Sequence, residues 1–140
     1  FGDLGKVVTG IGIAHDQVAA ARCTDTAHQG AAVSAAGNLD DYGAAYPGFL
    51  ILNPKLLGRV STPVKLWIHA HECGHQFRGP DEETADCFAV QRGRRQGWLT
   101  PDGLEEICSF IRPSKGSSMH FSGSHRCEAM RACYADPKVR

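Results

Sequence analysis

The sequence lacks a net charge, because 15 Lys and Arg residues balance 15 Asp and Glu residues. Proteins that hold nucleic acids by their phosphates carry an excess of basic residues, so this balance argues against a nucleic-acid partner. Long apolar runs are lacking too, whereas a membrane-spanning helix needs about 20 consecutive apolar residues. We therefore expect neither nucleic-acid binding nor insertion into a membrane.

The sequence also lacks any Cys-x-x-Cys pair, although it contains six cysteines in 140 residues. That spacing is typical of zinc ribbons and thioredoxin-like redox sites, so its absence argues against both. An even number of dispersed cysteines favours two or three disulfides, which form in oxidising compartments. The chain begins at Phe1 and not at Met, as a mature exported protein would. We expect a secreted or periplasmic protein; the alternative is a set of reduced, buried thiols.

The length and composition are those of one globular domain, with 42% hydrophobic and 21% charged residues among 140. Phe49–Leu52 is a short apolar run between turn residues, which predicts a strand. Thr62-Pro63, Asp81 and Thr100 are cap-type residues ahead of helical spacing, and they open predicted helices over residues 62–77, 82–96 and 100–111. A fourth helix is predicted over residues 124–134. The expected fold is a single α+β domain over residues 1–140, with a short sheet followed by a mainly helical C-terminal half.

His71-Glu72-Cys73-Gly74-His75 forms an H-E-x-x-H motif inside the first predicted helix. Residues four apart lie on one face of a helix, so His71 and His75 can present two imidazoles to one Zn²⁺ ion. Glu72 lies beside that face, where it can act as general base on a water that zinc has activated. The motif therefore predicts a catalytic site with Zn²⁺ as cofactor, on what would be the active-site helix.

A catalytic zinc site needs three protein ligands and leaves a fourth position to water. Glu82 opens the next predicted helix, and Asp86 lies one turn later, where it can orient a ligand imidazole. Asp81 is the rival third ligand, but it needs a tight turn directly after the first helix. Glu83 is a further alternative, more simply explained as a solvated carboxylate in a first helical turn. We favour Glu82.

Glu82-Glu83-Thr84-Ala85-Asp86 is an E-x-x-A-D motif. With H-E-x-x-H, it resembles the gluzincin zinc metallopeptidases, most closely the HtpX-like and CAAX-prenyl-protease branch. The resemblance covers residues 66–90 and implies a small, zincin-like domain in a minimal soluble form. It also implies that Glu82 is the third ligand and that Asp86 supports the site from outside the metal's coordination shell.

Residues 120–126 are more loosely similar to the H-P-x-x-x-x-R segment of the same branch, with Phe121 in place of the proline. This similarity implies that His120 and Arg126 bind substrate or stabilise the oxyanion. In zinc peptidases of this kind an edge strand pairs with the substrate, and Phe49–Leu52 is the candidate. A place in the core is the equal alternative for this strand.

The predicted function is zinc-dependent hydrolysis of peptide bonds by an endopeptidase, with a peptide or protein as substrate and Glu72 as general base. The alternative is a non-catalytic, zinc-stabilised, disulfide-containing secreted binding module. Only six residues separate His75 from Glu82, which leaves little chain for the walls of a cleft. A disulfide-rich binding domain with an accidental motif is a third reading. Cys73 and Cys87 flank the two predicted metal-binding turns, where a disulfide between them would join the helices.

Overall fold

The computed structural model describes the backbone of residues 23–25, 28–35, 42–46, 49–52, 54–118 and 120–136. Side chains are described for Tyr42 and for residues 56–118 and 120–136. In this second set, 72% of the residues are helical and none lies in a strand. The predicted α+β class is therefore wrong for this part of the chain, which is a helical fold. The physical reason is that the described buried side chains come from helices and their connections, which pack against one another.

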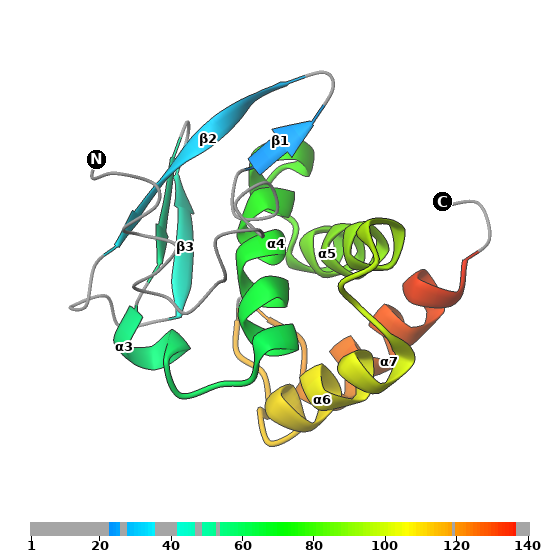
Figure 1. The fold of residues 1–140 in the computed structure, drawn as a ribbon. Helices are drawn as coiled ribbons and strands as arrows, with labels where there is room; N and C mark the ends of the chain where they lie inside the picture. The colour runs from blue at the N-terminus through cyan, green and yellow to red at the C-terminus, as the bar shows by residue number, and fades with distance from the viewer. Residues whose placement is uncertain are drawn as a thin grey trace.

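Where the backbone alone is described, four strands precede the helices (Figure 1). They are β1 (Cys23–Asp25), β2 (His28–Ala35), β3 (Gly43–Tyr46) and β4 (Phe49–Leu52), in the order β1-β2-β4-β3. β2 and β4 are parallel, and the other two pairs are antiparallel. The predicted strand Phe49–Leu52 is thus confirmed as β4. Its predicted role as a substrate-binding edge is wrong, because β4 pairs with a strand on each side.

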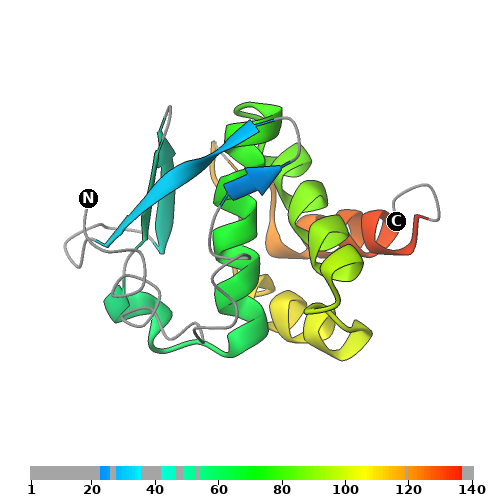
Figure 2. The same ribbon diagram turned by 45° about the horizontal axis from the view of Figure 1, so that its top comes forward.

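The helices are α3 (Pro54–Leu57), α4 (Thr62–Arg78), α5 (Glu82–Gln96), α6 (Pro101–Ile111) and α7 (Gly123–Ala135). The four longer ones begin and end within one residue of the predicted bounds. Figures 1 and 2 both show α4 in the middle, with β3 on one side and α5 and α7 on the other, while β2 runs across to β1 beside α4. No helix of the described residues is long and apolar enough to cross a membrane.

Polar caps and turn residues fix the ends of the helices. Asp81 accepts a hydrogen bond from the backbone N–H of Thr84 at 2.8 Å and so caps α5. Gly97 ends α5 in the left-handed conformation, with φ 84°, which a residue without Cβ adopts freely. The cap of α4 is Ser61 and not Thr62, which is already its first helical residue. α4 ends at Arg78 and α5 begins at Glu82, so the turn between these two helices is short.

The described core lies where α4 meets α5 and α6. It is built from apolar side chains at helical spacing, with one residue each from α3, α7 and the connection before α6. Its members are Leu57, Val64, Leu66, Trp67, Ile68, Ala70, Cys73, Phe88, Ala89, Val90, Leu99, Leu104, Ile107, Ile111 and Met130. Since α4 contributes the largest share, this helix and the motif it carries are held from several sides.

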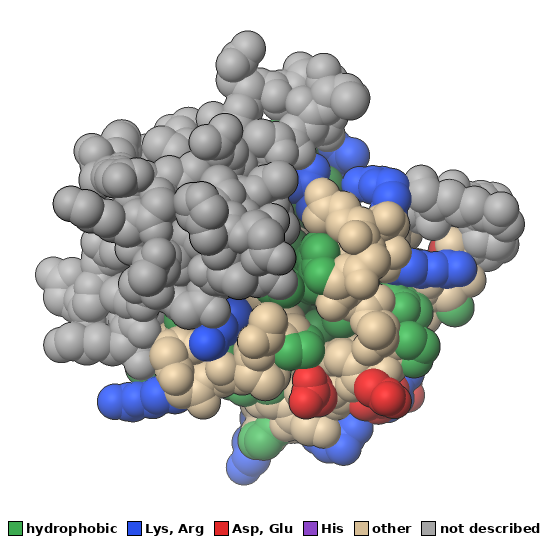
Figure 3. All heavy atoms as spheres, viewed as in Figure 1, with side chains coloured by type: hydrophobic (Ala, Val, Ile, Leu, Met, Phe, Trp, Pro, Cys, Tyr) green, Lys and Arg blue, Asp and Glu red, His purple; other side chains and the backbone are tan. Residues whose placement is uncertain are grey.

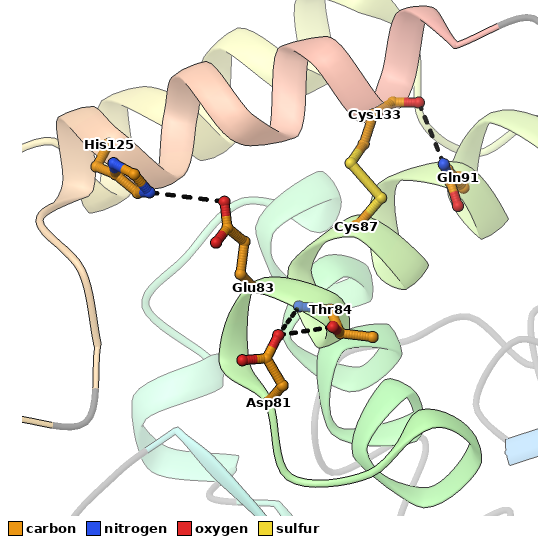
Figure 4. Close-up of a disulfide and its surroundings, with 7 residues drawn as sticks. All are labelled: Asp81, Glu83, Thr84, Cys87, Gln91, His125 and Cys133. Carbon is orange, nitrogen blue, oxygen red and sulfur yellow. Dashed lines mark hydrogen bonds and ion pairs between the residues drawn. A yellow bond between two sulfur atoms is a disulfide. The ribbon is translucent and has the colours of Figure 1, made fainter.

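Two disulfides tie α7 to its neighbours. Cys87 of α5 pairs with Cys133 of α7 (Figure 4), and Cys108 of α6 pairs with Cys127 of α7. The suggested link between Cys73 and Cys87 is wrong, because Cys87 is bonded to Cys133 and Cys73 is disulfide-bonded as well. Among the described residues no cysteine is free. The cysteines thus form a disulfide framework, as the sequence predicts.

Charged side chains on the face shown in Figure 3 do not form a single basic patch. Lys and Arg side chains are scattered over the described atoms, and Asp and Glu side chains lie near the lower edge. Basic and acidic side chains are therefore both present on this face, in keeping with the 15 basic and 15 acidic residues of the sequence.

Gly74 sets how closely α4 and α5 approach. A Cβ atom at this position would lie 3.0 Å from Cα of Ala85 and 3.1 Å from both its carbonyl oxygen and Cδ1 of Phe88. A methyl group therefore cannot be added unless the backbone of α5 gives way. Glu82 and Asp86 lie on either side of Ala85 in the sequence, so the contact at Gly74 also determines how far their side chains reach toward α4.

We predict that Gly74→Ala lowers the free energy of unfolding by about 1–3 kcal/mol, the usual cost of an extra methyl group in a packed contact. Urea denaturation followed by circular dichroism measures this change. Ser109→Ala, at an exposed position of α6, is the matched control and should be nearly neutral. If the two variants are equally stable, α4 and α5 do not depend on this close contact.

Candidate metal centre

The candidate metal centre is built by two helices that follow each other in the chain. α4 carries His71, Glu72 and His75, and α5 begins at Glu82 after a turn of residues 79–81. His71 and Glu72 are buried, and His75 is partly buried. The short turn brings the first residue of α5 back to the face of α4 on which both histidines lie.

One carboxylate oxygen joins the two helices. Oε2 of Glu82 lies 3.0 Å from Nε2 of His71 and 3.2 Å from Nε2 of His75. Two nitrogen or oxygen ligands of a tetrahedral zinc ion, each about 2.0–2.1 Å from the metal, lie roughly 3.3 Å apart. Both separations are close to this value, so Oε2 of Glu82 lies from each imidazole nitrogen at the spacing of two zinc ligands.

The other ring nitrogen of each histidine is already engaged. Nδ1–H of His71 donates to Oδ1 of Asp86 at 2.8 Å, and Nδ1–H of His75 donates to the carbonyl oxygen of Gly79 at 3.0 Å. A neutral imidazole with its proton on Nδ1 presents a lone pair at Nε2. Both Nε2 lone pairs then face a carboxylate oxygen, which is unfavourable unless a positive charge lies between them. Such outer hydrogen bonds are also what fixes the orientation of metal-binding histidines.

His120 brings a third imidazole to the same oxygen. Its Nε2 lies 2.9 Å from Oε2 of Glu82, and its side chain is about one third exposed, at 34%. A carboxylate oxygen offers two lone pairs, so three nitrogens at hydrogen-bond distance exceed what it can accept. His71, Glu82 and His120 form one group that could hold a metal ion, and His71, Glu72 and His75 form a second. The chemistry of the donor set fits a divalent cation such as Zn²⁺.

The acidic groups around His71 favour a positive charge there, which a proton supplies in the metal-free protein and a bound cation would supply in its place. Burial lowers the pKa of His71, but hydrogen bonds with Asp86 and Glu82 outweigh it and raise the pKa to about 9. Burial raises the pKa of Glu82, but the hydrogen bond with His71 and the nearby histidines lower it to about 2. Positive charge is therefore favoured at His71, and Glu82 stays ionised.

Arg126 supports the centre through Asp86. Its Nε–H and Nη2–H groups donate to the two oxygens of Asp86 at 2.8 and 2.9 Å, and its guanidinium lies over the ring of Trp67 at 5.4 Å. Burial raises the pKa of Asp86, but the hydrogen bonds from Arg126 and His71 outweigh it and hold the pKa below its usual range. The sequence placed Arg126 at the substrate or the oxyanion. In the structure, two of its N–H groups are bonded to a carboxylate of the protein.

Glu72 faces a cleft beside the histidines. One of its carboxylate oxygens lies 4.0 Å from Nε2 of His71, farther away than that of Glu82. The cleft has a volume of about 440 Å³, within the range of roughly 300–1,000 Å³ that is usual for ligand sites. Its lining comes from α4, the end of α6, the loop before α7 and α7 itself, together with Tyr42. The residues that line it are Tyr42, Trp67, Ile68, His71, Glu72, Phe110, Ile111, Ser114, Gly116, Ser117, His120 and Arg126.

The two rival carboxylates lie elsewhere (Figure 4). Asp81 caps α5, and one of its oxygens accepts bonds from both the backbone N–H and the hydroxyl of Thr84, at 2.8 and 2.6 Å. These bonds hold the pKa of Asp81 below its usual range. Glu83 lies 3.6 Å from Nε2 of His125, in an exposed pair. Of the three acidic residues at this turn, the structure brings Glu82 to the histidines.

His120 lines the cleft, and its ring nitrogen also lies as close to Glu82 as those of the motif histidines. The family resemblance implies contact with substrate and gives no indication of this closeness to Glu82. No spacing rule connects a loop residue before α7 with a motif on α4. Two hydrogen bonds close the loop that carries His120. The backbone N–H of Ser117 donates to the carbonyl of His120 at 2.8 Å, and the backbone N–H of His120 donates to Oγ of Ser117 at 3.2 Å.

Comparison of the chain with protein-family models, with curated proteins and with solved structures found no match. The group of histidines and glutamates could hold a metal ion, but by itself it does not identify a gluzincin peptidase.

Proposed function

We propose that the chain is a zinc-dependent peptidase that hydrolyses peptide bonds with water activated by Glu72. The observation that carries the proposal is Oε2 of Glu82 facing Nε2 of His71 and His75 while both Nδ1 atoms donate elsewhere. Three protein ligands with a fourth position left to water is the arrangement of catalytic zinc. When bound there, zinc polarises the scissile carbonyl and lowers the pKa of water to about 7.

The remaining residues have separate roles in this proposal. Glu72 takes a proton from the attacking water and returns it to the leaving amine, a role that needs a carboxylate beside the ligands and not among them. Asp86 keeps His71 in the tautomer that presents Nε2, and Arg126 keeps Asp86 ionised and in place. His120, which lines the cleft, donates a hydrogen bond to the substrate carbonyl as negative charge develops on it.

The proposed substrate is a peptide or protein segment that lies in the cleft in which Glu72 and His120 meet. The proposed place of action is an oxidising compartment, either outside the cell or in a periplasm. The two disulfides, which persist only where thiols are not kept reduced, support this location.

We predict that the purified protein binds about one zinc ion per chain and that Glu72→Gln keeps the metal but loses at least 100-fold in kcat/KM. The loss follows from removing the general base, whose contribution is typically about 10²–10⁴-fold. Elemental analysis and hydrolysis of a generic protein substrate measure the two quantities. Glu106→Gln, an exposed glutamate of α6, is the control, and equal activity in both variants would refute the assigned role of Glu72.

We further predict that Arg126→Ala lowers zinc affinity about 10–100-fold, as loss of an outer-shell partner usually does. The chain offers a matched control in Arg131, which makes the same two-point contact with Glu105 at 3.0 and 2.7 Å, but at the surface. Arg131→Ala should leave zinc affinity unchanged, because exposed ion pairs contribute little. Competition with a fluorescent chelator measures both affinities. A similar affinity in the two variants would show that the pair between Asp86 and Arg126 does not support the metal.

A second candidate function is a zinc-stabilised binding module without catalysis. The position of His120 favours it, since a fourth protein ligand would close the coordination shell, as in structural zinc sites. In that case, removing zinc with a chelator would unfold the chain, and no peptide would be cut. Glu72 argues for the peptidase, because a closed site has no water for a base to activate.

His120→Ala separates the two candidates. For a peptidase we expect zinc affinity to change less than tenfold and kcat/KM to fall about 10²–10³-fold, the usual effect of losing a donor to the oxyanion. For a closed structural site, the same variant loses zinc and melts at a lower temperature. Chelator competition, thermal denaturation and peptide hydrolysis are measured on the same preparation. If His120→Ala loses zinc and the wild-type chain hydrolyses no peptide, the two results together favour the binding module.

A further inference from the structure

Both described disulfides attach α7 to another helix, and each contains one cysteine that directly follows a residue near the metal centre in the sequence. Cys87 directly follows Asp86 in α5, and Cys127 directly follows Arg126 in α7. Asp86 and Arg126 are the two residues whose ion pair holds His71. Each half of this ion pair is therefore followed in the sequence by a residue that is covalently attached to another helix.

α7 has few apolar contacts of its own to hold it. Its buried residues are Gly123, Cys127 and Met130, so a disulfide cysteine is one of only three. Polar contacts add to these, and those with α5 are the bonds from Arg126 to Asp86, the bonds from Arg94 and Gln91 to carbonyl oxygens of α7, and the pair between His125 and Glu83. The hydroxyl of Tyr134 also donates to the carbonyl of Leu99 at 2.8 Å, and Arg131 pairs with Glu105 at the surface. With three buried residues in α7, the two disulfides supply a substantial share of what keeps this helix docked.

The two disulfides differ in their access to solvent. Cys108 and Cys127 are 0% and 3% exposed, whereas Cys87 and Cys133 are only partly buried. Figure 4 shows the Cys87–Cys133 bond spanning the gap between α5 and α7, near the C-terminal end of α7. A reductant that needs contact with sulfur therefore reaches the Cys87–Cys133 bond first in the folded chain.

We propose that the Cys87–Cys133 disulfide is a redox-sensitive clamp on the metal centre, such that its reduction weakens zinc binding. A dithiol reductant supplies two electrons and two protons, the S–S bond breaks, both sulfurs become thiols, and the reductant is oxidised to its own disulfide. Cys87–Cys133 ties α5, which carries Asp86, to α7, which carries Arg126, whereas Cys108–Cys127 ties α7 to α6. Once Cys87–Cys133 is reduced, only non-covalent contacts set the spacing of α5 and α7, so Arg126 holds Asp86 less firmly. This proposal rests on the proposed zinc site and adds its dependence on the oxidation state.

The test is the zinc affinity of the Cys87→Ser/Cys133→Ser double variant, measured with Zn²⁺ alone against a competing chelator. We expect a 10–100-fold loss of affinity, the size typical of a lost outer-shell partner, with helical circular dichroism retained. Arg131→Ala is the control, because it removes a surface contact of α7 but leaves both disulfides intact. An affinity within twofold of the wild-type value in the double variant would overturn the clamp.

A second measurement uses the wild-type chain, in case the double variant does not fold. The protein is reduced with dithiothreitol, which is then removed without air, and alkylation of a parallel sample identifies the thiols that were released. We expect Cys87 and Cys133 to be alkylated first, zinc affinity to fall with them, and reoxidation to restore it. An unchanged affinity after their reduction overturns the clamp and leaves the peptidase proposal intact. A wild-type chain that binds no zinc overturns both proposals.

Discussion

The close approach of α4 and α5 at Gly74 and Ala85 is the constraint on which the candidate site depends. Because a Cβ at Gly74 would lie 3.0 Å from Cα of Ala85, the two helices are as close as their backbones allow. Glu82 and Asp86 lie three residues before and one residue after this contact. One reaches Nε2 and the other Nδ1 of His71, so a single backbone contact places two acidic residues on opposite sides of one imidazole.

The charges around this contact form a chain that alternates in sign. Arg126 pairs with Asp86, Asp86 with His71, and His71 with Glu82, all within 3.0 Å. Buried charged groups are tolerated when each has an oppositely charged partner and hydrogen bonds. Removing one of these groups leaves its neighbour buried without a compensating charge. The pair between Arg131 and Glu105 has similar distances but lies at the surface, where solvent screens it. The two pairs have similar geometry, but only the buried pair between Arg126 and Asp86 contacts His71. Through this pair, α7 contributes to a site that α4 and α5 form.

Local features of the sequence predicted the helices well, because their signals are local. The cap at Asp81 and the glycine at residue 97 both lie at the predicted ends of α5, and the H-E-x-x-H spacing placed His71 and His75 on one face of α4. Preferring Glu82 to Asp81 agrees with the geometry, since Asp81 is engaged as a cap. The α+β class is wrong for the part of the chain whose side chains are described, because the core there packs helix on helix. The disulfide partners and the position of His120 depend on how α7 docks, which no local pattern encodes.

The buried position of Glu72 separates the two candidate functions in physical terms. A zinc ion held by Glu82 and two neutral imidazoles keeps one positive charge, since Arg126 already balances Asp86. Such a charge polarises a carbonyl and makes water more acidic. If His120 filled the fourth position, that charge would act on no water, and Glu72, 9% exposed and beside the cleft, would have no water to activate. The proposed peptidase therefore gives this buried carboxylate a role as a base that the proposed binding module does not.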